Sequence, residues 1–469
     1  MSEGDKSFRD EIATVDATGK RRWIYPSKPK GKFHRYRAAV SISLLAFLIF
    51  TPFIKVNGHP IFMLNFPERR FILFGEPFWP QDMNVLFLVV ITGIVFIIVF
   101  TTIWGRIWCG WACPQTIFME MVFRKVEFWL EGDGIEQRKL NEGPWNLKKI
   151  VIKFAKHCLF ILLSYGVAHI FLSWIIGVDQ LAAIIRDPIS EHSSGFVALN
   201  VFTFMFYGVF SWFREQACVI VCPYGRFQSV LLDQNTVVIS YDFKRGEPRG
   251  RKKNADDLST KVSAQIPGDC IDCHQCVRVC PTGIDIRNGT QLECVNCTAC
   301  IDACDHIMDK LQRPRGLIRF ASYNQIVAGV ADHFNTRVKA YAVLCTGLIT
   351  LCLFLLLSRP MVHLSVGRLS GSTFQTLADG SVINLYRVQL ANNTFKTLDI
   401  KLKLKENSGE LRAQDNIVVP SYGLVETVIN VLIKAEDLKS SKTYIDLDII
   451  HDSKTILTEE LIFVSPRKD

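Results

Sequence analysis

The stretch that decides the fold is CIDCHQCVRVCPTGIDIRNGTQLECVNCTACIDAC, from Cys270 to Cys304. It reads C-x-x-C-x-x-C-x-x-x-C-P, closed by Pro281, and the same cysteine spacing then returns once. In such a run, three thiolates in a tight loop hold three iron atoms of one cubane, and the fourth reaches the neighbouring cluster. The spacing predicts two [4Fe-4S] clusters, held by Cys270, Cys273, Cys276 and Cys304 (cluster 1) and by Cys294, Cys297, Cys300 and Cys280 (cluster 2).

Two other interpretations of this stretch are a pair of zinc sites and a disulfide scaffold. Zinc ribbons use two-cysteine knuckles with longer spacers, which fit a doubled four-cysteine run badly. Disulfides are disfavoured because the topology derived below places the segment in the cytosol. Asp305 stands where a second proline would close the repeat, which alters the turn and removes no ligand. His274 and His306 are expected to be bystanders on the solvent side of the loops.

The composition indicates a membrane protein with metal chemistry. The chain has 469 residues, of which 49% are hydrophobic, so it is too long for one ordinary domain and too apolar to be wholly soluble. Its 15 cysteines exceed what a cytosolic protein needs without a metal. The net charge of +9 would fit nucleic acid, but basic loops facing anionic lipid explain it better, and we expect no nucleic-acid partner.

Apolar runs long enough to cross a bilayer, about 20 residues each, lie at 38–55, 84–104, 154–176, 196–213 and 339–358. The loop 105–153 is rich in Lys and Arg, whereas the loop 177–195 carries only Arg186. By the positive-inside rule, the N-terminus, the loop 105–153 and residues 214–338 are cytoplasmic, and residues 359–469 lie outside. No small-residue cleavage site follows the first run, so we expect an uncleaved span.

The C-terminal region has the pattern of an all-β sandwich. Apolar and polar residues alternate in the runs 382–390, 398–404, 425–433 and 444–450, separated by Asn, Gly, Ser and Pro turns, as in short strands with one buried face. The region contains no cysteine, and we expect it to bind or anchor rather than to catalyse.

These features predict a multidomain membrane protein: an α-helical bundle of five transmembrane spans, an inserted ferredoxin-like two-cluster module and a C-terminal all-β sandwich. The predicted parts are a cytoplasmic N-terminal tail (1–37), a four-span membrane domain (38–240), a cytoplasmic linker and two-cluster module (241–338, core 263–310), a fifth transmembrane helix (339–358) and an outer domain (359–469).

A second cysteine motif occurs twice. RIWCGWACP begins at Arg106, and REQACVIVCP begins at Arg214. Both contain C-x-x-x-C-P at the cytoplasmic end of a span, which predicts a duplicated helical hairpin. If each span continues as helix, its two cysteines share one face, and the proline marks a helix end or kink. Soft thiolates suit Cu(I), zinc or a cluster, so we expect a metal or redox site at Cys109, Cys113, Cys218 and Cys222.

Other candidate ligands have simpler interpretations. Packing is expected for Cys158, Cys345 and Cys352, and also for Met119 and Met121, which would otherwise be soft donors. His157 and His169 point about 120° apart on an ideal helix, which favours core histidines over haem or quinone ligands.

With these parts in place, the chain resembles the CcoG/FixG/RdxA family of cytochrome oxidase accessory proteins over nearly its whole length. The resemblance is carried by the spans with two C-x-x-x-C-P motifs, the segment YDFKRGEPRG at Tyr241 to Gly250, the doubled ferredoxin motif, the fifth span and an immunoglobulin-like tail. It implies a bacterial inner-membrane reductase that converts Cu(II) to Cu(I) during maturation of a cbb-type oxidase. Cys109, Cys113, Cys218 and Cys222 would then form the copper site.

The copper chemistry is consistent with these residues. Thiolates favour Cu(I) over Cu(II), which prefers nitrogen and oxygen ligands, and the clusters supply electrons singly. The implied partners are the membrane, copper ions, oxidase assembly factors or a copper transporter or chaperone, and an unidentified electron donor. Two alternatives remain open: a quinol-linked electron carrier similar to NapH and NosR, and a non-enzymatic scaffold for oxidase assembly.

Overall fold

The chain forms two compact units in the computed structural model. The first comprises Met1–Phe50, Ile91–Leu172 and Asp179–Ile349, and the second comprises Thr51–Val90, Ser173–Val178 and Thr350–Asp469. The structure describes residues 13–16, 18–56, 58–66, 70–73, 75–78, 83–250, 268–329, 335–369, 374–377, 380–405, 409–434 and 440–466. Residues 263–267 of the predicted cluster-module core lie outside these ranges.

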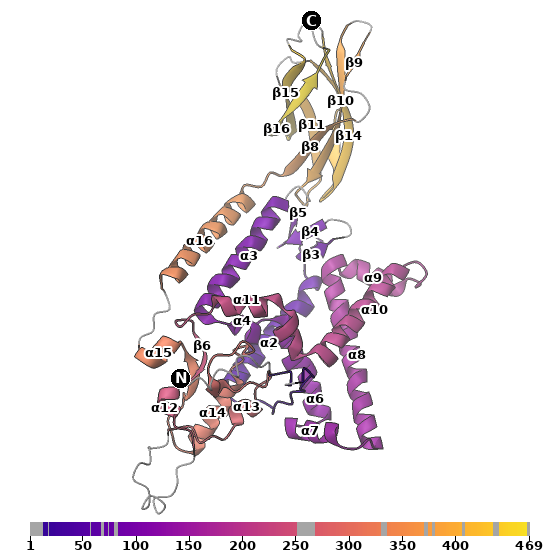
Figure 1. Ribbon diagram of the computed structural model, residues 1–469. Helices are drawn as coiled ribbons and strands as arrows, with labels where there is room; N and C mark the ends of the chain where they lie inside the picture. The colour runs from indigo at the N-terminus through magenta and orange to yellow at the C-terminus, as the bar shows by residue number, and fades with distance from the viewer. Residues whose placement is uncertain are drawn as a thin grey trace, which may run out of the picture. The chain divides into compact units, whose positions relative to one another are not determined.

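The five predicted spans are confirmed as long apolar helices (Figure 1): α2 (Lys32–Phe50), α3 (Met83–Trp104), α8 (Leu147–Ile176), α10 (Ser193–Gly208) and α16 (Thr336–Leu357). The turns η2 (Thr51–Phe53) and η5 (Val209–Phe213) extend α2 and α10. Much of their apolar surface is exposed, for example at Val343 and Phe354, as expected for helices whose solvent is lipid. The helices α2 and α8 begin at Lys32 and Leu147, several residues before the predicted apolar runs. The basic residues that precede those runs are therefore part of the helices.

Short helices follow the second and fourth spans in the first unit. After α3 these are α4 (Ile107–Trp111), α5 (Pro114–Ile117), η4 (Phe118–Phe123), α6 (Arg124–Leu130) and α7 (Gly134–Glu142). The helix α9 (Val178–Arg186) precedes α10, and η6 (Ala217–Val221) and α11 (Pro223–Leu231) follow it.

The cysteine-rich module is closed by a pair of strands. Its elements are β6 (Val238–Tyr241), α12 (Phe243–Gly246), α13 (Gln275–Arg278), η8 (Ile286–Asn288), α14 (Ala299–Lys310), β7 (Ile318–Ala321) and α15 (Tyr323–Ala328). The strands β6 and β7 pair antiparallel, so the segments before and after the cysteines are held together. Ile239, Ile301 and Met308 are buried in one group with Cys270 and Cys276.

The predicted all-β sandwich is confirmed in the second unit (Figure 1). One sheet has the order β12-β14-β10-β8, with β9 also paired to β10, and the other has the order β13-β11-β15-β16. Their bounds are β8 (Val362–Arg368), β9 (Gln375–Thr376), β10 (Val382–Asn392), β11 (Leu398–Leu404), β12 (Glu410–Arg412), β13 (Ile417–Val419), β14 (Leu424–Ile433), β15 (Lys442–His451) and β16 (Lys454–Val464). Val388, Ile400, Ile429 and Leu447 are fully buried between the sheets.

The second unit also contains short strands that were not predicted. They are β1 (Lys55–Val56), β2 (His59–Pro60), β3 (Phe62–Asn65), β4 (Arg70–Leu73) and β5 (Glu76–Phe78). The hydroxyl of Tyr422 in the sandwich donates to the carbonyl oxygen of Phe71 at 3.3 Å. His59 stacks on Phe395 with ring centroids 4.6 Å apart, so the segment between the first two spans packs on the sandwich.

Candidate metal centres

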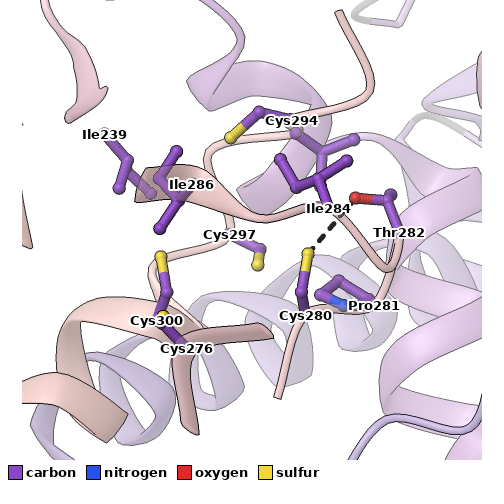
Figure 2. A pocket seen from close by; sticks show the side chains of 11 residues that line it. Ile239, Cys276, Cys280, Pro281, Thr282, Ile284, Ile286, Cys294, Cys297 and Cys300 are labelled. Atoms are coloured by element: carbon purple, nitrogen blue, oxygen red, sulfur yellow. Dashed lines mark hydrogen bonds between the residues drawn. The ribbon is translucent and has the colours of Figure 1, made fainter. Parts of the chain in front are cut away.

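The four cysteines predicted for cluster 2 surround one cavity. Cys280, Cys294, Cys297 and Cys300 line it with Ile239, Ile284 and Ile286, and Figure 2 shows the four sulfur atoms around a common space. The Cys280 thiol lies 3.4 Å from the Thr282 hydroxyl. Four thiols inside an apolar shell form a donor set that fits an iron–sulfur cluster.

The four cysteines predicted for cluster 1 surround a second cavity. Cys270, Cys273, Cys276 and Cys304 line it with Tyr241, Met308 and Ile318. Cys276 also reaches the edge of the other cavity, so the two sites are neighbours. The fourth cysteine of each set comes from the opposite run. Assignment of each thiol to its cluster stays a prediction, and the cavities support it.

Both cysteine loops have the same backbone conformation. The residues on either side of the second cysteine are left-handed in each loop: Asp272 and His274 in the first, Asn296 and Thr298 in the second. Left-handed residues are uncommon outside glycine and occur where the chain must turn tightly. Directly after them, α13 and α14 begin, so Cys276 and Cys300 lie in a first helical turn. The exposed N–H groups of a helix start favour an anionic group.

The geometry disfavours the zinc and disulfide interpretations. All 15 cysteines are free thiols. Two ligands of one zinc ion lie at most about 4.6 Å apart, twice the Zn–S bond length. In the described part of the chain, Asp187, Glu191 and His192 are the one group of three or more possible ligands whose donor atoms all lie within 4.8 Å. No three thiols are close enough to share one ion, as expected where a multi-iron core separates them.

Burial determines the protonation of these thiols before a metal binds. It raises the pKa of Cys276, Cys294 and Cys304 to about 12 and that of Cys297 to about 11. The thiols are therefore protonated at neutral pH until a metal displaces the protons.

The two C-x-x-x-C-P motifs form the same local structure, but not the continuous helix considered above. Both α3 and α10 end before their motif, and each second cysteine is the N-cap of a new helix. Cys113 (φ −63°, ψ 125°) precedes Pro114 at the start of α5, and Cys222 (φ −69°, ψ 114°) precedes Pro223 at the start of α11. Proline fits the first helical position because its fixed φ suits the helix and its missing N–H is not needed there.

The fold brings the two motifs together. Cys218 interacts electrostatically with Cys109, Cys113 and Cys222, and burial raises its pKa to about 12. The amide nitrogen of Gln228, on α11, lies 3.5 Å from the sulfur of Cys109. No three of these thiols have sulfur atoms that all lie within 4.8 Å of one another. We refer to Cys109, Cys113, Cys218 and Cys222 as the four-cysteine site.

The first motif packs directly on the loop of cluster 2. Cys109 is buried in one group with Val279, Val295 and Cys297. The indole N–H of Trp111 donates to the carbonyl oxygen of Asn296 at 3.2 Å. A Cβ at Gly110 would overlap the carbonyl oxygen of Val295 and lie 3.0 Å from the carbonyl group of Asn296, so only glycine permits this approach.

The second motif is preceded by a buried group of ion pairs. Arg214 donates two hydrogen bonds to the Glu127 carboxylate, at 3.0 and 2.7 Å. Glu215 lies 3.6 Å from Arg124 and 3.3 Å from Arg21. Burial alone would raise the pKa of Glu127, but Arg214, Lys156 and Arg124 lower it below its usual value.

Two contacts that the sequence did not reveal attach the cluster module to the N-terminal segment and to the first span, within the first unit. Asp302 on α14 accepts hydrogen bonds from the backbone N–H groups of Phe33 (3.1 Å) and His34 (2.7 Å), and so caps the start of α2. Along the N-terminal segment, Ser27 donates its N–H to the Arg278 carbonyl. The acidic side chain of Asp302 within the second cysteine run was at most a faint signal for the first contact.

The predictions for the other candidate ligands are confirmed only in part. Met119, Met121, Cys345 and Cys352 are buried, as predicted, and His274 and His306 are exposed. The expectation of packed residues on α8 is wrong for Cys158 and His157, which are exposed because they lie on an outward face of this helix. His169 is partly buried. His157 contacts the Tyr207 hydroxyl at 2.9 Å, and His169 contacts its own helix at Tyr165.

Comparisons with known proteins agree with this architecture. Residues 213–323 match the family model "4Fe-4S dicluster domain", residues 86–132 match "4Fe-4S binding domain", and residues 352–466 match the Ig-like fold at the C-terminus of FixG. The nitrogen fixation protein FixG of Rhizobium meliloti is 34% identical, over 80% of this chain and 77% of its own. Protein RdxA of Cereibacter sphaeroides is 31% identical, over 82% of this chain and 83% of its own.

The helices, the thiol-lined cavities and these matches define a membrane-bound iron–sulfur electron-transfer protein. Relatives that are more than 30% identical over more than three quarters of their own length establish the family. The chain belongs to the FixG/RdxA family, as the motifs predicted.

Proposed function

We propose that this protein is a cupric reductase, which converts Cu(II) to Cu(I) at the four-cysteine site and so supports assembly of a cbb-type cytochrome c oxidase. The observation that carries the proposal is that Cys109 belongs to the same buried group as Cys297 and Val295 of the cluster 2 loop. One thiol of the proposed copper site and one predicted ligand of cluster 2 thus share one apolar group.

The residues of the chain have distinct parts in the reaction. When bound, the clusters supply single electrons, and each Cu(II) takes up one electron to become Cu(I). The thiols of the four-cysteine site lose protons as they bind copper, and thiolate ligands favour the reduced ion. The Gln228 amide, itself fully buried, orients the Cys109 sulfur. Apolar neighbours such as Val279 exclude water from the path.

The proposal includes release of Cu(I) from the four-cysteine site to a partner. Cu(I) would pass from it to a copper chaperone or transporter, or to an oxidase assembly factor.

We place the N-terminus, the four-cysteine site and the clusters on the cytoplasmic side of a bacterial inner membrane, and the sandwich on the periplasmic side. The excess of Lys and Arg in the loop 105–153 over the loop 177–195 supports this orientation. The five-part division at residues 37, 240, 338 and 358 is part of the same proposal.

A second candidate function is quinol oxidation, which one cavity favours. It is lined by Gln115, Glu120, Glu215, Cys218 and Thr282, among others. Thr282 lies two residues from Cys280, a predicted ligand of cluster 2. A quinol bound there would be adjacent to cluster 2.

The test is an anaerobic reaction of the reduced, purified protein with stoichiometric Cu(II). The cupric reductase predicts prompt reoxidation of the clusters, seen in their absorbance and paramagnetic signal, with equal formation of Cu(I). Replacement of Cys109, Cys113, Cys218 and Cys222 by serine is expected to abolish it, whereas Cys345→Ser, which changes a packed membrane cysteine, is not. Reduction at the parental rate without the four cysteines would refute the copper site. Clusters that stay reduced until a quinone is added would establish the quinol-linked carrier. Clusters that react with neither copper nor quinone would favour the non-enzymatic assembly scaffold.

A further inference from the structure

Arg106 is a buried cation without an acidic partner. Only 4% of its surface is exposed, and it makes no ion pair with any carboxylate in the ranges that the structure describes. One terminal nitrogen donates to the carbonyl oxygen of Leu292, and its Nε has no hydrogen-bond partner. Burying a charged group without a partner is costly, so a missing anion is indicated.

The position of Arg106 shows where that anion belongs. Leu292 lies two residues before Cys294, a predicted ligand of cluster 2. On the other side, a Cβ at Gly225 would lie 3.2 Å from a terminal nitrogen of Arg106, so the guanidinium lies between the second motif and the cluster 2 loop.

Arg37 is in a similar situation. It is 3% exposed, and its Nε donates to the carbonyl oxygen of Gly110 at 2.7 Å. One terminal nitrogen has no hydrogen-bond partner, and among the described carboxylates none pairs with it. Gly110 lies against the backbone of Val295 and Asn296 in the cluster 2 loop, so Arg37 is held beside that loop.

Cluster 1 has a different electrostatic environment. The arginine beside its thiols, Arg287, forms ion pairs with both Asp285 (2.6 Å) and Asp272. Its positive charge is neutralised locally, whereas the charges of Arg37 and Arg106 remain available to cluster 2.

We propose that Arg37 and Arg106 are positioning residues that raise the reduction potential of cluster 2 above that of cluster 1. Reduction adds one negative charge to a cluster, and a fixed cation in a buried site stabilises that charge. An electron that enters at cluster 1 therefore settles on cluster 2, next to Cys109. The inference rests on the proposed assignment of thiols to clusters; it does not depend on copper.

The test is a redox titration of the full-length, cluster-loaded protein without copper, followed by paramagnetic resonance. We expect two midpoint potentials, and Cys273→Ser, which removes a cluster 1 ligand, should eliminate the lower one. Arg106→Gln is expected to lower the upper midpoint by the equivalent of a tenfold change in the reduced-to-oxidised ratio, about 59 mV for one electron. Arg37→Gln should lower the same midpoint, and Arg106→Lys, which keeps the charge, should restore most of the shift. Arg138→Gln, on the surface of α7, serves as the matched control.

Several results would overturn the proposal. One is loss of the upper midpoint in Cys273→Ser, because cluster 1 would then be the more oxidising one. Another is an unchanged upper midpoint in Arg106→Gln and Arg37→Gln with full iron and sulfide content. If Arg106→Gln fails to hold iron, two measurements still test the proposal: the loss of one midpoint in Cys273→Ser, which shows which potential belongs to which cluster, and the upper midpoint of Arg37→Gln. Failure of copper reduction with the expected potentials would refute only the proposed function.

Discussion

The two C-x-x-x-C-P turns have one local structure and two different environments. Each places its second cysteine as the N-cap of a helix that begins with proline. The first turn packs on the cluster 2 loop through Cys109 and Gly110, and its arginine, Arg106, has no described carboxylate partner. The second is preceded by Arg214, which is paired with Glu127 at 2.7 Å.

The difference indicates different roles for the arginines of the two motifs. An arginine precedes each motif, but the charge of Arg214 is neutralised by a carboxylate inside the protein and stabilises the packing of helices. By our proposal, the charge of Arg106 acts on an anionic cluster. The surroundings of each motif thus determine whether its arginine is structural or electrostatic.

The largest expected effect tests the structural side of this comparison. Glu127→Ala would remove the closer carboxylate of buried Arg214 and leave it only Glu215, at 3.7 Å; loss of one partner of a buried pair costs about 3 to 5 kcal/mol. We expect a clear fall in the thermal unfolding midpoint of the purified protein. Glu142→Ala removes an exposed partner of Arg138 and should cost at most about 1 kcal/mol. Equal midpoints for the two variants would show that the buried pair has no structural role.

A smaller effect is expected at the contact between the first motif and cluster 2. In Gly110→Ala the new methyl group would meet the backbone of Val295 and Asn296, which cannot move aside as a side chain can. Overpacking of this kind costs about 1 to 3 kcal/mol, and it should separate Cys109 from the loop and slow cluster reoxidation by Cu(II).

The matched control for that variant is Gly208→Ala in α10, where an added Cβ meets no atom within 4 Å. Stopped-flow absorbance would measure both rates. A normal rate in Gly110→Ala would mean that close packing here is not needed for electron transfer.

The smallest effect concerns the second pair of thiols and pH. Because burial raises the pKa of Cys218 to about 12, its thiol is protonated at neutral pH and must release a proton to bind Cu(I). Affinity should therefore rise with pH, by about tenfold per pH unit for each proton released. Cys218→Ser should reduce this slope by one proton, measured by competition with a chromophoric Cu(I) chelator, whereas Cys158→Ser should leave it unchanged. An unaltered slope in Cys218→Ser would exclude Cys218 as a ligand.

Much of the fold could be predicted because it depends on local patterns. The five spans follow from the length of apolar runs, and strands such as β11 (Leu398–Leu404) follow from strict alternation over a few residues. The small sheet of β3, β4 and β5 was missed because its short strands, with Pro and Gly among them, carry too little periodicity. The condition of one continuous helix through Cys109 and Cys113 is not met, because α4 ends at Trp111 and Pro114 starts a new helix. The proline thus marks a helix end and not a kink.

The sequence alone determined the chemistry of the sites. The spacing of the cysteines specifies tight loops with thiols for two clusters, and the repeated C-x-x-x-C-P motif contributes four further cysteines. Only the tertiary structure decided what those thiols face. The contacts between Arg106 and Leu292, between Trp111 and Asn296, and between Asp302 and the start of α2 join residues far apart in the chain. No local period encodes such contacts, because they depend on which helices pack together and which charges find partners when they do.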